Sequence, residues 1–140
     1  MDQKIEAMSD EDAARIEKQR SWVRDHFEPQ ARSEYDNLSG KLRLIQSIIA
    51  AGWIEPSETW KLQSLGVAFG DALAQALGLA WVTVEDEYGR DPALQVPSTT
   101  ILVFPLTAIS KRIERGDKVE VVDLFNSAMR TVQDARQKGA

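Results

Sequence analysis

The chain has 140 residues, of which 43% are hydrophobic and 28% are charged, as is typical of a single globular domain. It contains no cysteine, which excludes disulfides, a thiol nucleophile and zinc–thiolate sites. Its formal net charge of −5 disfavours binding to a phosphate backbone, so we expect no nucleic-acid partner.

The first 20 residues are polar and acidic and lack the apolar core of a secretory signal. No stretch approaches the roughly 20 apolar residues of a membrane span. We therefore expect a cytoplasmic protein that does not bind membranes. We place one domain at residues 9–137, between a flexible N-terminal segment (1–8) and a flexible C-terminal segment (138–140).

Apolar spacing predicts two helices in the first 53 residues. The first covers 9–27 and begins with Ser9 as its N-cap, followed by three acidic residues. The second covers 35–53 and ends at Gly52, a plausible C-terminal cap. Their expected buried stripes are Ile16, Val23 and Phe27 in the first helix, and Leu38, Leu42, Ile45 and Ile49 in the second.

The segment 56–78 predicts a central helix, because it is apolar on most sides. Gly66 and Gly70 are four residues apart within it. Each weakens the helix by about 1 kcal/mol relative to alanine, so we expect them to permit the close approach of another element. The expected apolar residues are Leu62, Leu65, Phe69, Leu73, Ala76 and Leu77 on one face, and Trp60, Val67 and Ala74 on a second face.

The pattern then changes to short β-like runs separated by turn residues. We expect about three antiparallel strands, at roughly 80–86, 93–96 and 99–104, with the last buried on both faces. Two more helices follow, over 105–116 and 121–137. The sequence therefore predicts an α+β domain with helices at both ends packed on a small antiparallel sheet.

Several motifs resemble a family of small bacterial proteins catalogued as a domain of unknown function. They are GKLRLIQSII, WIEPSETWKLQSLGVAFGDAL, VEDEYGRDPAL, FPLTAISKRIERG and VVDLF. The resemblance covers roughly Leu38 to Phe125. It implies a single bacterial, cytoplasmic domain, and it supplies neither a catalytic residue nor a substrate.

The acidic segment around Tyr88 is the first candidate site. Glu85, Asp86, Glu87 and Asp91 carry oxygens of the kind that a hard cation binds. However, consecutive strand residues point to opposite faces, so these carboxylates are not expected to converge. We interpret the segment as an acidic turn and expect no metal ion and no cofactor.

The central helix and the aromatic residues supply the remaining candidates. Asp71 lies on the narrow polar strip of the helix and is the first residue to examine for a perturbed pKa. A groove lined by Trp60, Trp81 and Tyr88 would suggest a ligand site. His26, the one histidine, is interpreted as a surface residue beside Trp22. The candidate ligand-binding residues are Trp60, Asp71, Trp81, Glu85, Asp86 and Tyr88.

No motif of nucleophilic or nucleotide chemistry is present. We therefore expect a non-enzymatic protein-binding module, such as an adaptor, a regulator or an immunity-type protein. The alternative is a small-molecule binder or weak hydrolase with an acidic site between the central helix and the sheet. The expected partner is another protein. A homodimer is a further possibility, which exposed apolar surface on Trp60 and Val67 would favour.

Overall fold

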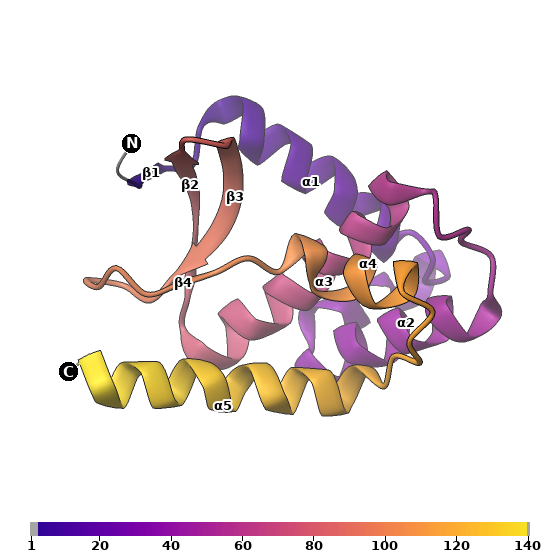
Figure 1. The fold of residues 1–140 in the computed structure, drawn as a ribbon. Helices are drawn as coiled ribbons and strands as arrows, with labels where there is room; N and C mark the ends of the chain where they lie inside the picture. Colours follow the sequence, from indigo (N-terminus) through magenta and orange to yellow (C-terminus); the bar gives the residue numbers. More distant parts are fainter. Residues whose placement is uncertain (1–2, 140) are drawn as a thin grey trace.

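The computed structural model describes residues 3–139 and shows five α-helices and a 3-10 helix packed with a four-stranded sheet (Figure 1). This confirms the α+β class. The elements in chain order are β1 (Lys4–Ala7), α1 (Asp10–Arg24), η1 (Pro29–Asp36), α2 (Leu38–Ala51), α3 (Thr59–Leu77), β2 (Ala80–Asp86), β3 (Gly89–Gln95), β4 (Leu102–Val103), α4 (Leu106–Glu114) and α5 (Val121–Gly139).

Helix α3 is the central element, as its apolar surface predicts. It contacts α1, α2, α4 and α5, and Figure 1 shows it between α1 and α5. Leu65 and Leu73 on one face and Val67 on the other are all fully buried. Because Val67 packs with Ile16 and Leu106, it does not contribute to an exposed apolar surface.

The predicted helix boundaries follow from local chemistry. The Ser9 hydroxyl accepts a hydrogen bond from the Asp12 amide at 3.1 Å and so caps α1. Gly52 ends α2 with φ of 70°, a left-handed conformation that glycine adopts without a steric penalty. This turn directs the chain away from α2 immediately before Trp53.

The sheet is antiparallel with strand order β1-β2-β3-β4, so it has four strands rather than about three. The additional strand is Lys4–Ala7, which the sequence analysis placed in the N-terminal segment 1–8. Its pairing with β2, for example Ile5 with Val84, is a long-range contact. Residues 1, 2 and 140 of the expected flexible segments lie outside the described residues.

The two later strands differ from their expected bounds. β3 begins at Gly89 instead of residue 93, because β2 and β3 form one tight hairpin with Asp86 opposite Gly89. It includes Pro92, which the sheet accommodates because β4 pairs only with Leu94 and Gln95. The expected strand 99–104 is reduced to Leu102–Val103, and both residues are half-buried, so the prediction of burial on both faces was wrong.

Within residues 3–139, no helix is both long and apolar enough to cross a membrane.

Candidate functional site

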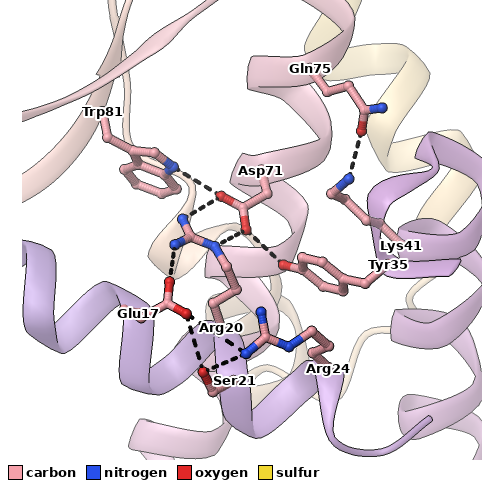
Figure 2. Close-up of polar contacts among 9 residues, drawn as sticks. All are labelled: Glu17, Arg20, Ser21, Arg24, Tyr35, Lys41, Asp71, Gln75 and Trp81. Carbon is pink, nitrogen blue, oxygen red and sulfur yellow. Dashed lines mark hydrogen bonds and ion pairs between the residues drawn. The ribbon is translucent and has the colours of Figure 1, made fainter. Parts of the chain in front are cut away.

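Asp71 of α3 is the centre of a polar cluster between α1, η1 and β2 (Figure 2). Its carboxylate accepts two hydrogen bonds from Arg20, at 2.6 Å from Nε and 2.8 Å from Nη2. The Tyr35 hydroxyl donates a third at 2.7 Å, and the Trp81 indole donates a fourth at 3.0 Å. The cluster therefore joins three elements to the central helix through one side chain.

These four bonds occupy the acceptor positions of the Asp71 carboxylate, which offers about four. The hydrogen bond with Asp71 raises the pKa of Arg20, so the guanidinium stays charged. Burial raises the pKa of Tyr35, and the negative charge of Asp71 raises it further, so the hydroxyl remains a donor. The geometry is that of a satisfied structural ion pair, without an oxygen available for a reacting group.

Tyr35→Phe is expected to reduce the loss of stability at alkaline pH. The unfolded chain releases the Tyr35 proton at a pKa of about 10, below the raised pKa of the folded state. The part of the unfolding free energy that depends on the Tyr35 proton is thus fully present below about pH 10. It is lost at about 1.4 kcal/mol per pH unit as the pH rises toward the folded-state pKa. Denaturant unfolding above about pH 10 measures this slope. If the unfolding free energies of the wild type and Tyr35→Phe fall equally with pH in this range, the prediction is contradicted.

Lys41 of α2 is a second unusual group beside the cluster (Figure 2). It is buried, with its Nζ 2.6 Å from the Gln75 side-chain oxygen and 5.1 Å from the centre of the Tyr35 ring. Burial lowers the pKa of Lys41, while the negative charges of Asp71 and Asp36 oppose this shift. The ring and the amide therefore solvate a cation that has no direct carboxylate partner within residues 3–139.

The acidic segment forms the β2–β3 hairpin. Asp86 accepts a hydrogen bond from the Tyr88 amide at 2.8 Å, which is ordinary turn chemistry. Tyr88 at its tip is 89% exposed. Among residues 3–139, no group of three or more His, Cys, Asp or Glu side chains is arranged to hold a metal ion.

The six candidate ligand-binding residues are divided among three places. Asp71 and Trp81 meet in the polar cluster. Glu85 lies opposite Arg90 in the register of the β2–β3 hairpin, and Asp86 and Tyr88 lie at the turn of the same hairpin. Trp60 lies at the start of α3 and packs against Trp22. Trp60, Trp81 and Tyr88, which the sequence analysis considered as the lining of a shared groove, therefore lie in three different places.

A different aromatic group gathers where the ends of α1 and α2 meet the start of α3. The Trp22 ring lies 4.5 Å from the His26 ring and 6.0 Å from the Trp60 ring, both edge-on. His26 stacks on Trp53 at 6.1 Å, with 23° between the ring planes. We call these four residues, Trp22, His26, Trp53 and Trp60, the aromatic patch.

The aromatic patch is held in place but remains open to solvent. The Nδ1–H of His26 donates a hydrogen bond to the Trp22 carbonyl at 2.8 Å, which fixes the imidazole beside the tryptophans. Trp53 is 67% exposed and Trp60 is 40% exposed. Tryptophan usually buries most of its large apolar surface, so two exposed indoles on one surface are informative.

Several acidic residues neighbour the aromatic patch in the sequence. Asp25 is next to His26, Glu55 follows Trp53 by two residues, and Glu58 precedes Trp60 by two. Asp25 pairs with Arg32 and Glu58 pairs with Lys61, whereas Glu55 and Glu28 have no ion-pair partner within the described part of the chain. Two of the acidic residues near the exposed indoles in the sequence are therefore without a cation.

The sequence pattern singled out Asp71 and Trp81 as candidates, but not the residues that bind Asp71. Arg20 and Tyr35 are 51 and 36 positions away, and no local pattern connects them to Asp71. It also linked His26 to Trp22 by their spacing of four residues. It did not connect this pair to Trp53, whose position depends on the turn at Gly52.

Comparisons with known proteins extend this description without adding a function. A family model described as "Domain of unknown function (DUF3806)" matches residues 41–125, more than half of the chain. This confirms the resemblance seen in the sequence motifs. No curated protein matches the chain.

A solved structure has a similar fold. It is a crystal structure at 1.50 Å resolution of a protein from Bacteroides thetaiotaomicron VPI-5482, with a TM-score of 0.72 and 17% sequence identity. The match covers 92% of this chain and 48% of the other, so the chain spans about half the length of that protein. At this identity the similarity concerns the fold alone.

Proposed function

The chain belongs to the DUF3806 family, and we propose from the surface of the chain itself that it is a non-enzymatic protein-binding module that binds a basic partner through the aromatic patch. We further propose that it works in the bacterial cytoplasm, where a chain without cysteine needs no oxidising conditions. The observation that carries the proposal is the exposure of Trp53 within a cluster of four aromatic rings.

Exposed tryptophans fixed by their neighbours favour protein recognition. Tryptophan is enriched among the few interface residues that supply most of the binding energy. Here the hydrogen bond of His26 to the Trp22 carbonyl holds the ring on which Trp53 stacks, so little side-chain freedom remains to be lost on binding. The aromatic patch is therefore prepared to contact an apolar surface on a partner.

The acidic residues that neighbour the aromatic patch in the sequence favour a basic partner. Glu28 and Glu55 have no ion-pair partner among the described residues, and the whole chain has a net charge of −5. A partner with lysine or arginine around an apolar centre would complement this surface. Such complementarity chiefly increases the association rate and makes that rate sensitive to salt.

The alternative function, a small-molecule binder or weak hydrolase acting between the central helix and the sheet, has less support. Asp71 is the carboxylate of that region, and its acceptor positions are occupied by Arg20, Tyr35 and Trp81. Glu85 and Asp86 lie in the hairpin instead. The geometry therefore favours binding at the aromatic patch over chemistry at Asp71.

Trp53→Ser is expected to abolish the recovery of a partner from cell lysate. Truncating an interface tryptophan costs about 2 kcal/mol or more, which is roughly a 30-fold loss of affinity. The measurement compares proteins retained by immobilised wild type, Trp53→Ser and Tyr88→Ser. Tyr88→Ser is the matched control, because it removes an exposed aromatic ring outside the aromatic patch.

Two results would contradict the proposal. One is a partner retained equally by wild type and Trp53→Ser. The other is a partner lost equally with Tyr88→Ser. If light scattering shows a dimer that Trp53→Ser converts to a monomer, the aromatic patch binds a second copy, and the proposal of a different protein as partner is wrong.

A further inference from the structure

A second surface feature lies apart from the aromatic patch and from the Asp71 cluster. It is a cavity of about 380 Å³ between α1, α3, β3 and α4. Arg15, Gln63 and Lys111 supply its principal polar side chains, Phe104 and Leu106 supply an apolar wall, and Asp91 is also part of the lining. Pockets for small organic ligands begin at about 300 Å³, so its size suits a small metabolite.

The cavity contains two cations that lack a direct ion-pair partner among the described residues. Arg15 donates a hydrogen bond from Nη2 to the neutral Gln63 side chain at 3.2 Å, which orients the guanidinium. Within residues 3–139, neither Arg15 nor Lys111 lies within ion-pair distance of a carboxylate. Two cations and one carboxylate, Asp91, line the cavity, so the cavity is a local site for an anion.

The apolar wall limits the kind of anion. Phe104 is 44% exposed although it is a large aromatic residue, and Leu106 beside it is buried. An exposed ring in a concave site is covered when a ligand presents an apolar group to it. A ligand that fits the whole cavity therefore carries a charged group at one end and an apolar body at the other.

Because Asp91 lowers the net positive charge of the cavity, it favours a ligand whose anionic group carries a single negative charge. Arg15 and Lys111 contribute two positive charges and Asp91 one negative charge, so the cavity has a net charge of +1. A carboxylate brings this sum to zero, whereas a phosphate monoester, with a charge of about −1.5 to −2 at pH 7, exceeds it. A guanidinium forms two parallel hydrogen bonds with either anion, so the charge balance is what favours the carboxylate.

We propose that this cavity binds a small monocarboxylate with an apolar body, its carboxylate at Arg15 and Lys111 and its apolar part against Phe104. The proposal is independent of the protein-binding function, because no residue of the aromatic patch lines the cavity. Arg15 and Trp22 are seven residues apart on α1, which is about 10 Å along the helix axis. The two sites are therefore separable by mutation.

The test is a titration of the full chain with three probes of matched size, followed by amide NMR shifts. The probes are 3-phenylpropionate, phenyl phosphate and 2-phenylethylamine. We expect saturable millimolar binding of 3-phenylpropionate, with shifts at Arg15, Phe104 and Lys111. We expect weaker binding of phenyl phosphate and none of 2-phenylethylamine, because the amine lacks the anion.

Variants test whether the two cations hold the carboxylate. Arg15→Ala and Lys111→Ala are each expected to weaken 3-phenylpropionate binding about tenfold, the loss of one charge-assisted hydrogen bond. Lys118→Ala is the control, because Lys118 is an exposed lysine that pairs with Glu120 outside the cavity. Asp91→Asn is expected to increase the affinity for phenyl phosphate severalfold, because it removes the repelling charge.

The following results would overturn the proposal: no saturable binding of 3-phenylpropionate, equal binding by Arg15→Ala and the wild type, or tighter binding of phenyl phosphate than of the carboxylate. Circular dichroism of each variant establishes that it is folded. Because Arg15 and Lys111 are exposed, their truncation is not expected to affect folding. Loss of partner capture in Trp53→Ser, with 3-phenylpropionate binding unchanged, would support both sites separately.

Discussion

Asp71→Ala is expected to lower the free energy of unfolding by about 3–5 kcal/mol, the cost of breaking a buried ion pair by removing one partner. The substitution leaves the Tyr35 hydroxyl and the Trp81 indole without their acceptor, and the Arg20 guanidinium keeps only its bond to Glu17. The Asp71 side chain is only 11% exposed, so water replaces it poorly. Chemical denaturation of the wild type and the variant measures the difference.

Two further variants test whether the loss of stability in Asp71→Ala comes from the charge of Arg20. Glu17→Gln removes the second acid bonded to Arg20, but Glu17 is 53% exposed, so we expect a loss of no more than about 1 kcal/mol. Arg20→Met in the Asp71→Ala background is expected to restore part of the stability, because it removes a half-buried charge whose one remaining partner is the exposed Glu17. A loss below about 1 kcal/mol in Asp71→Ala would show that solvent reaches the cluster.

The sequence predicted the helices well because their determinants are local. Ser9 and Gly52 mark boundaries through their own side chain or backbone conformation. The central position of α3 follows from apolar residues on most of its sides, and Val67 and Leu65 on different faces are indeed both fully buried. Each of these features is present within a few residues of the chain.

The sheet was less predictable because pairing joins distant segments. Lys4–Ala7 contains one large apolar residue, Ile5, and becomes a strand by pairing with β2, about 80 residues away. In contrast, the β-branched run 99–104 has strong strand propensity but mostly stays outside the ladder. Ser98 has a φ of 65°, and the Thr99 hydroxyl donates to the Val96 carbonyl, so a turn occupies the start of that run.

In the candidate site too, features with local determinants were predictable and contacts between distant segments were not. Asp71 stood out from the sequence because a carboxylate on a mostly apolar helix must find partners. Which partners it finds depends on how α1 and η1 pack against α3, and no spacing encodes this. The aromatic patch was missed for a similar reason, since Trp53 reaches His26 only after the left-handed turn at Gly52.

The second large effect is expected at Gly66, where α3 meets the start of α4. A Cβ at this position would lie 2.6 Å from both the Cα and the carbonyl oxygen of Leu106 and 2.7 Å from the Pro105 carbonyl oxygen. All three are backbone atoms, so a change of rotamer does not relieve the overlap. This confirms the prediction that the two glycines of α3 permit another element to approach closely. The start of α4 lies against Gly66, and the side chains of Trp81 and Pro105 lie against Gly70.

Gly66→Ala is expected to lower the free energy of unfolding by about 2–3 kcal/mol, even though alanine favours the helix by about 1 kcal/mol. Gly70→Ala is the matched comparison, because its Cβ would meet the side chains of Trp81 and Pro105 instead of backbone. Trp81→Phe itself removes a hydrogen bond to Asp71, so the comparison is between backgrounds: Gly70→Ala is expected to cost less in Trp81→Phe than in the wild type, whereas Gly66→Ala is expected to cost as much in Leu106→Ala as in the wild type. Thermal or denaturant unfolding of the single and double variants tests this, and a Gly66→Ala protein as stable as the wild type would mean that α4 does not rest on α3 at this point.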